Sequence, residues 1–159
     1  MLSKIVSGGQ TGVDRGALDA AIASGLDHAG WCPKGRKAEE GSIPACYRLC
    51  ETPSSRYAER TEWNVRDSCG TLVLSCGALR GGTKLTVKFA RRYGRPCLVV
   101  ALDGRQDAGD VAKWIRESNI EVLNVAGPRE SSRPGIETDA RRFVAEVICR
   151  DRSHTPAGS

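Results

Sequence analysis

Aromatic side chains are scarce in this sequence of 159 residues, which contains three tryptophans, three tyrosines and two phenylalanines. Binding of single-stranded nucleic acid needs aromatic platforms interleaved with basic residues, and no such run occurs here. The net charge of +5 suits a small anionic ligand but is too low to indicate a nucleic-acid partner. We therefore expect the protein to have no nucleic-acid partner.

Long apolar runs are missing as well. No segment has the length that a membrane span needs. The first four residues lead directly into an apolar strand, without the stretch that is typical of a signal peptide. We expect a cytoplasmic protein with no membrane partner.

Residues that commonly bind metals or act as nucleophiles are few or scattered. The two histidines, His28 and His154, lie far apart, and the seven cysteines form no C-x-x-C motif. A G-x-S-x-G motif is also absent. The sequence therefore indicates no metal site and no catalytic residue, and we expect the cysteines to be reduced thiols.

Strands and helices alternate along the chain. Short apolar runs predict strands at Ile5–Val6, Leu26–Trp31, Thr71–Leu74, Cys97–Leu102 and Glu121–Val125. Helical periodicity and end signals predict helices at Ala17–Ser24, Arg56–Asp67, Lys84–Tyr93, around Trp114, and at Ile136–Ile148. This alternation predicts a single α/β domain over residues 1–150, Rossmann-like and doubly wound, with a mostly parallel sheet flanked by helices. Residues 151–159 have the composition of a disordered tail.

Three of the predicted strands end in glycine-rich loops. The first is Ser7–Gly16, the second contains Gly81-Gly82-Thr83, and the third is Gly127–Gly135. Because the carboxyl ends of parallel strands share one edge, we expect the three loops to line a single crevice. Glycines allow close approach of the backbone, helix starts offer free N–H groups, and nearby cations strengthen hydrogen bonds to an anion. The cations expected at the crevice are Arg15, Arg80, Lys84, Arg129 and Arg133. The loops therefore predict a site for a phosphorylated small molecule.

The first loop matches no standard phosphate motif. Gly8, Gly9 and Gly12 do not form G-x-G-x-x-G, and no Gly-Lys-Ser/Thr follows Gly8 at the spacing of a P-loop. The polar stretch Lys34–Gly41 permits two interpretations. It is either a solvated surface loop or a lid whose Lys34, Arg36 and Lys37 reach the anion.

The helix at Arg56–Asp67 carries a tryptophan on a polar stripe. Trp63 could be an interface residue, a side chain packed under a loop, or a stacking platform for a flat ligand, and we favour the packed alternatives. Three carboxylates could approach the crevice, as general bases or as ligands for a donor-rich ring: Asp14, Glu62 and Asp67. We favour roles for these carboxylates as helix caps and ion-pair partners of nearby arginines.

Several motifs together resemble one known family. They include Ser7–Ala17, Gly30–Arg36, Arg60–Asp67, Gly81–Thr83 and Asn124–Ser131, which span nearly the whole chain. With these stretches the sequence resembles the putative molybdenum carrier family, circularly permuted relatives of YpsA-type proteins in the Rossmann-like superfamily of LOG and DprA. The resemblance implies a homo-oligomer, a dimer or tetramer, that binds and protects molybdenum cofactor, a phosphorylated pterin, with molybdoenzymes as further partners.

One position departs from the enzymatic relatives. LOG-type phosphoribohydrolases carry G-G-x-G-T-x-x-E with a catalytic glutamate, whereas Thr86 stands at that place here. A threonine cannot act as that acid or base, so we predict a carrier rather than an enzyme. The alternatives are a nucleoside-monophosphate hydrolase that uses another carboxylate, for which Glu62 is the candidate, and a nucleotide-sensing module without catalysis. The residues expected to bind the ligand are Gly8, Gly9, Gln10, Thr11, Gly12, Asp14, Arg15, Lys34, Trp63, Gly81, Gly82, Thr83, Lys84, Arg129 and Ser131.

Overall fold

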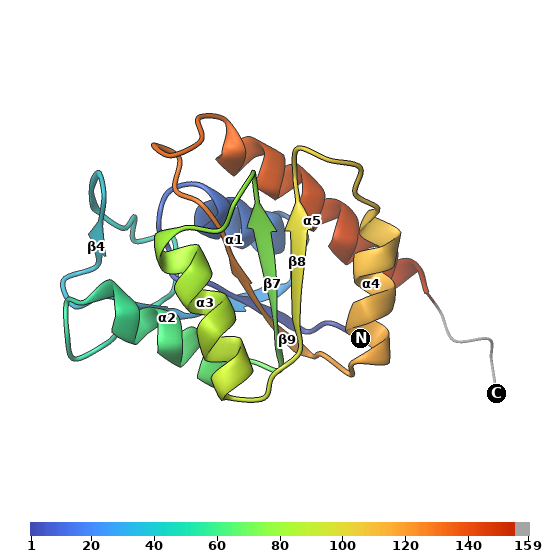
Figure 1. Cartoon of the computed structure of the whole chain (residues 1–159), viewed down its shortest axis with the longest axis horizontal. Helices are drawn as coiled ribbons and strands as arrows, with labels where there is room; N and C mark the ends of the chain where they lie inside the picture. The colour runs from blue at the N-terminus through green and yellow to red at the C-terminus, as the bar shows by residue number, and fades with distance from the viewer. Residues whose placement is uncertain (155–159) are drawn as a thin grey trace.

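A five-stranded parallel sheet forms the centre of the molecule in the computed structural model, which describes residues 1–154 (Figure 1). The strand order is β2-β1-β9-β7-β8. The strands are β1 (Lys4–Val6), β2 (Asp27–Ala29), β7 (Gly70–Ser75), β8 (Cys97–Ala101) and β9 (Val122–Ala126). Every residue of β7 is buried, as its continuous apolar sequence predicts for a strand covered on both faces. The predicted α/β, Rossmann-like class is confirmed.

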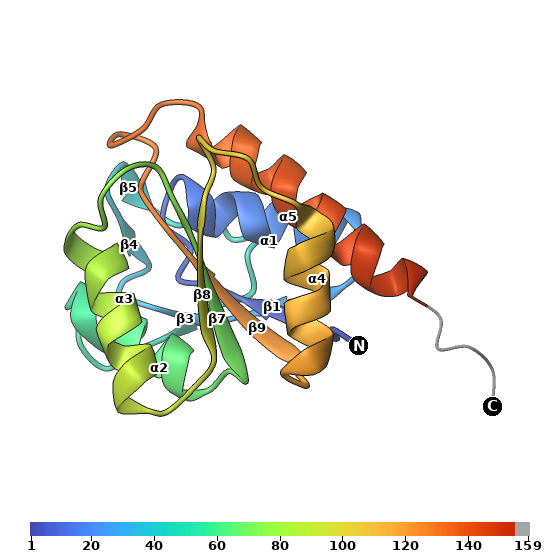
Figure 2. The same cartoon turned by 45° about the vertical axis from the view of Figure 1, so that its right-hand side comes forward.

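Five helices cover the two faces of the sheet: α1 (Val13–Ala23), α2 (Tyr57–Arg66), α3 (Gly81–Arg92), α4 (Ala108–Glu117) and α5 (Ile136–Ser153). Helix α5 packs against α1 and α4 on one face, and α2 packs against α3 on the other, as Figure 2 shows. The larger core lies under α1, α4 and α5, where Leu72, Ile115 and Val144 are buried together. A smaller core of Val65, Phe89 and Ala90 lies under the second layer.

Some boundaries differ from the sequence prediction. Helix α1 begins at Val13 rather than Ala17, and α3 begins at Gly81 rather than Lys84, so both helices start inside the glycine loops. The predicted strand Leu26–Trp31 is interrupted at Gly30, where φ is 147° and an added Cβ would lie 1.9 Å from the carbonyl oxygen of Ser7. As a result β2 joins the main sheet, while β3 (Trp31–Cys32) pairs with β6 (Cys50–Glu51).

The polar stretch after β3 forms a hairpin. Strands β4 (Lys37–Ala38) and β5 (Gly41–Ser42) pair in antiparallel fashion, with Glu39 and Glu40 at the tip. Arg36, just before the hairpin, donates hydrogen bonds to three carbonyl groups between Ile43 and Tyr47. These bonds connect the residues before the hairpin to those after it, and they engage the Arg36 guanidinium within the protein.

The end of the chain corrects one boundary. Helix α5 continues to Ser153, and Asp151 is buried, where its carboxylate accepts a hydrogen bond from the Leu2 amide at 2.8 Å. Residues 151–153 are therefore helical and not a disordered tail, and residues 155–159 of that prediction lie outside the described residues. Within the described chain, no helix combines the length and the apolar character needed to cross a membrane.

Candidate functional site

A cavity of about 860 Å³ opens at the carboxyl ends of β1, β9 and β7. These three strands are neighbours in the sheet, so the loops that follow them meet at this edge, as the sequence predicts. The loops contribute Gly8, Gly82 and Gly127, among other residues, to the lining. Ligands of parallel α/β sheets bind in crevices of this kind, which makes the cavity the candidate site.

The start of α3 forms one wall of the cavity. Gly81 (φ 49°) and Gly82 lie in the lining, and a Cβ added to either would meet no described atom within 4 Å. No side chain of residues 1–154 caps this helix, and its first turn contains no acidic residue. The Thr83 and Lys84 amides donate to the Arg80 carbonyl, whereas the Gly81 and Gly82 amides have no hydrogen-bond partner within the described residues. These two amides and the positive end of the helix dipole favour an anion at this wall.

The start of α1 is different, because the protein itself occupies its donors. The Gly12 amide donates to Glu137 at 3.0 Å, the Gln10 amide donates to Asp14 at 3.2 Å, and the Val13 amide donates to the Pro128 carbonyl. Gly12 also packs against the backbone of residues 128–130. We expected the amides at the start of α1 to bind phosphate. Carboxylates of the protein itself accept hydrogen bonds from two of them.

Four arginines give the cavity a positive charge: Arg60, Arg80, Arg129 and Arg133. Asp14 is the one carboxylate that lines the cavity in the described chain. Its Oδ2 atom lies 3.0 Å from Nη1 of Arg60. In this position the guanidinium leaves no room for a side chain at residue 8, because a Cβ there would lie 1.6 Å from the same nitrogen. Arg80, Arg129 and Arg133 were expected to add positive charge to the crevice, whereas Arg60 was expected only as an ion-pair partner of a carboxylate.

Tyr57 is the one aromatic residue in the lining among residues 1–154. Lys37 and Arg129 each place their charged group 4.6 Å from the centre of its ring, and Arg60 lies 5.6 Å away. Sequence analysis missed Tyr57, because nothing in its local pattern shows that the first turn of α2 reaches the crevice.

Three of the predicted cations do not line the cavity. The Arg15 side chain is buried against the hairpin, where it pairs with Glu40 and donates to the Gly9 carbonyl at 3.0 Å. Lys34 and Lys84 are exposed and do not belong to the lining. The expected positions of these three cations are therefore corrected, and the positive charge of the cavity comes from α2 and from the second and third loops.

Trp63 is a packing residue. Its ring meets that of Trp31 edge to face, with centroids 4.8 Å apart, and the Arg66 guanidinium lies 4.6 Å from its centre. Trp31 donates from its indole nitrogen to Asp67 at 2.8 Å. The hydrogen bond from Arg66 lowers the pKa of Asp67, although burial opposes the shift. Trp63 is not part of the cavity lining, which corrects its place among the expected ligand-binding residues.

Two other positions bear on the hydrolase alternative. Glu62 lies outside the lining and accepts a hydrogen bond from the Tyr93 hydroxyl at 2.8 Å. Thr86 lies inside the lining, but its hydroxyl donates to the Gly82 carbonyl at 2.8 Å. Glu62 therefore does not supply the missing carboxylate to the cavity.

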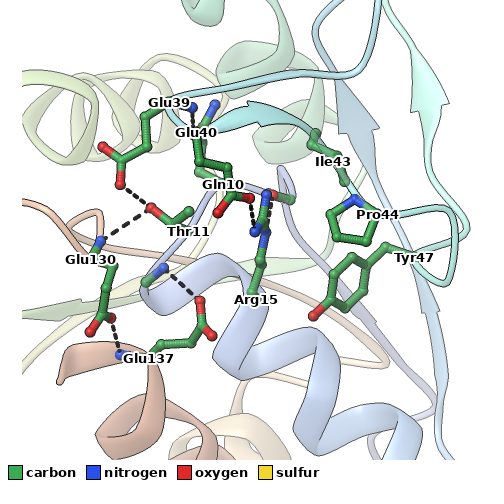
Figure 3. A network of polar contacts seen from close by, with 12 residues as sticks. Gln10, Thr11, Arg15, Glu39, Glu40, Ile43, Pro44, Tyr47, Glu130 and Glu137 are labelled. Atoms are coloured by element: carbon green, nitrogen blue, oxygen red, sulfur yellow. Dashed lines mark hydrogen bonds and ion pairs between the residues drawn. The ribbon is translucent and has the colours of Figure 1, made fainter. Parts of the chain in front are cut away.

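The remaining predicted residues of the first and third loops lie outside the cavity lining. Thr11 donates to Glu39 at the hairpin tip, as Figure 3 shows. Ser131 also donates to Glu39, and Gly9 faces Leu49 and Ile43 rather than the cavity. The predicted residues that do line the cavity are Gly8, Gln10, Asp14, Gly81, Gly82, Thr83 and Arg129.

All seven cysteines are free thiols, and Cys76 lines the cavity. Burial raises the pKa of Cys76, so this thiol is protonated at neutral pH. Within residues 1–154, no three histidine, cysteine, aspartate or glutamate side chains lie together as a metal site would require.

Comparison with known proteins gives two findings. The model of the family described as "Circularly permutated YpsA SLOG family" matches residues 5–148. A solved structure from Syntrophus aciditrophicus SB, described as a "Putative molybdenum carrier protein", is 48% identical over 92% of this chain and 94% of that chain, with a TM-score of 0.85. No match was found among curated proteins.

Proposed function

The chain belongs to the circularly permutated YpsA SLOG family, and on that basis we propose that its cavity binds a phosphorylated, ring-containing small molecule, with molybdenum cofactor as the leading candidate. Family membership and the similar carrier protein support a general ligand-binding role. The name of that similar protein suggests a molybdenum-related ligand. Molybdenum cofactor is a pterin with a phosphate, so it combines both parts that the site would have to hold.

One observation carries the phosphate half of the proposal. The uncapped start of α3 opens on a cavity that four arginines line. In our proposal the phosphate lies against the N–H groups of Gly81 and Gly82, and Arg80 and Arg133 neutralise its charge. Charge-assisted hydrogen bonds of this kind are about twice as strong as those between neutral groups.

The ring half rests on Tyr57. A tyrosine face in a cavity of about 860 Å³ leaves room for a fused heterocycle, since small-molecule sites span roughly 300–1,000 Å³. Arg129 and Arg60 lie close to the same ring, and guanidinium groups also stack on planar heterocycles. Tyr57 thus takes the stacking role that the sequence offered as one alternative for Trp63.

A nucleotide is the second candidate ligand, because it also joins a phosphate to a planar ring. Binding without catalysis suits the lining better than hydrolysis does. The single carboxylate that lines the described cavity, Asp14, is engaged by Arg60 and by the Gln10 amide. A general acid or base needs a proton position that is free to exchange with substrate.

The proposal also includes the location, the oligomeric state and the partners of the protein. A carrier of molybdenum cofactor would act in the cytoplasm, form a homo-oligomer and transfer its ligand to molybdoenzymes. Size-exclusion chromatography with light scattering measures the oligomer directly.

The decisive experiment is mass spectrometry of the small molecule that co-purifies with the native protein. We expect a phosphorylated pterin, together with slower loss of molybdenum cofactor activity when the protein is added to the free cofactor. Affinity should fall as salt rises, because ions screen part of the attraction. Retention of a nucleotide without protection of molybdenum cofactor would contradict the carrier proposal and favour the second candidate.

A further inference from the structure

Glu39, at the tip of the β4–β5 hairpin, occupies a set of converging donors. Its carboxylate accepts hydrogen bonds from the Thr11 hydroxyl, from the Ser131 hydroxyl at 2.6 Å and from the Ser131 amide at 3.4 Å. The positive charge of Arg129 also acts on Glu39. Thr11 belongs to the first glycine loop and Ser131 to the third. Figure 3 shows these two loops meeting beside Glu39, where the Glu130 amide donates to the Thr11 hydroxyl.

Such a set of donors suits a tetrahedral oxyanion as well as a carboxylate. Two hydroxyl groups and one backbone N–H form the donor set of many phosphate sites, and a nearby arginine strengthens them. Glu39 itself is exposed, so solvent and solutes can reach its carboxylate from outside.

A second observation is an unused hydrogen-bond donor of Arg15, whose partner Glu40 lies next to Glu39 at the hairpin tip. The Arg15 side chain is 8% exposed, and its Nη2 atom has no hydrogen-bond partner within the described residues. Its Nη1 atom pairs with Glu40, whose side chain is 49% exposed. A buried guanidinium with an unused donor is costly, and an anion close to the hairpin tip would reduce that cost.

We propose that Thr11, Ser131 and Arg129 form an oxyanion site that Glu39 occupies as a built-in competitor. An incoming phosphate, either free or as part of a larger molecule, displaces the carboxylate and releases the hairpin. Neither Thr11 nor Ser131 lines the cavity, whereas Arg129 does, so this site adjoins the cavity but differs from the α3 site in its hydroxyl donors.

Release of the hairpin would also alter the rim of the cavity. Lys37 belongs to β4 and lies 4.6 Å from the centre of the Tyr57 ring, which lines the cavity. Gln10 also lines the cavity, and it connects to the hairpin through the Lys37 carbonyl and the Glu39 amide, both at 3.2 Å. Displacement of Glu39 would thus uncover one face of Tyr57 and loosen Gln10.

Calorimetric titration with inorganic phosphate tests the site. Glu39→Ala should bind one phosphate more than the wild-type chain, or bind it about tenfold more tightly, as expected for removal of a competing charged group. Glu117→Ala is the matched control, because it removes the same charge from exposed α4 and should behave as wild type. Glu39→Ala/Ser131→Ala should lose the gain. Equal phosphate binding by Glu39→Ala and wild type would overturn the proposal, whereas the α3 site would bind phosphate in both.

Hydrogen exchange on the wild-type chain distinguishes the two sources of phosphate without any substitution. Faster exchange at amides 37–42 with inorganic phosphate would show that the site accepts the free anion. Faster exchange only with adenosine monophosphate would show that it accepts phosphate carried by a larger molecule. Unchanged exchange with both would show that Glu39 is a structural clasp, and the proposal would be wrong.

Discussion

Asp14 and Arg60 meet in the wall of the cavity, where Oδ2 of the carboxylate lies 3.0 Å from Nη1 of the guanidinium. The side chains are 7% and 12% exposed, so neither charge is well hydrated. Asp14 comes from α1 and Arg60 from α2, which lie on opposite faces of the sheet. This ion pair therefore links the two layers at the site.

The first prediction concerns Asp14→Asn. Loss of the carboxylate leaves Arg60 without its charged partner, and we expect the free energy of unfolding to fall by about 1–3 kcal/mol, as for other partly buried polar groups. Phosphate affinity should rise, because the cavity loses its negative charge. Urea denaturation and calorimetry check the two effects, with Asp110→Asn as an exposed control. Weaker ligand binding by folded Asp14→Asn would mean that Asp14 contacts the ligand directly.

The second prediction tests α3 as the phosphate site through Gly82→Asp. An added Cβ at Gly82 meets no described atom within 4 Å, and a carboxylate near a helix start stabilises the helix by about 0.3–1 kcal/mol. The variant should therefore fold at least as well as wild type, while phosphate affinity drops by more than about tenfold through charge repulsion.

Gly104→Asp is the matched control for this experiment. It makes the same substitution outside the cavity lining, where the nearest atom to an added Cβ is a flexible glutamine side chain at 3.6 Å. The control should retain wild-type affinity. Equal loss of binding in both variants would indicate a general effect of charge rather than a phosphate site at α3.

The location of the cavity followed from the sequence because it depends on a rule of topology. Loops after neighbouring parallel strands must share an edge, and strands that end near Val6, Ser75 and Ala126 are recognisable from their apolar runs. The roles of single side chains did not follow. Glu137 reaches Gly12 across 125 residues of sequence, and no local pattern shows that this contact fills the helix end where we expected a phosphate.

The aromatic residues illustrate the same difference. Trp63 stands out in the sequence as a large ring on a polar stripe. The ring that it packs against belongs to Trp31, which is 32 residues away and in another element. In the sequence, Tyr57 shares one face of a predicted helix with Thr61 and Val65, and nothing marks it as a ligand-binding residue. Its position in the cavity depends on how the first turn of α2 sits beside the third loop, where Arg129 contacts its ring, and only the folded arrangement determines that.

The third prediction separates packing from ligand stacking at Trp63. Because the ring is partly buried against Trp31, Trp63→Ala should lower the free energy of unfolding by about 2–3 kcal/mol. Ligand affinity of the folded fraction should not change, since Trp63 lies outside the lining. Trp63→Phe should recover most of the stability. A loss of affinity in Trp63→Ala without a loss of stability would contradict the packing role.

The fourth prediction concerns Glu62→Gln and the hydrolase alternative. The glutamine can still accept the hydrogen bond from Tyr93, so we expect a stability change below about 1 kcal/mol. Binding of adenosine monophosphate and release of free adenine should match the wild type, because Glu62 does not reach the cavity. Chromatographic assay of free base measures this. Base release by wild type that disappears in Glu62→Gln would restore the hydrolase alternative.

The last prediction concerns acid release of the hairpin. Burial alone would raise the pKa of Glu39, but the hydrogen bonds from Ser131 and Thr11 outweigh it and lower the pKa below the ordinary value of 4.5. Because the pKa is lower in the folded state, the contribution of Glu39 to stability is present above pH 4.5 and is lost as the pH falls through the folded value. The Ser131 amide reports this protonation, since it donates to the Glu39 carboxylate. Its NMR shift should titrate with a midpoint below 4.5 in wild type and lose that transition in Glu39→Gln, a control that separates Glu39 from Glu130 and Glu137 in the same network. A transition that persists in Glu39→Gln would show that the acid response does not come from Glu39.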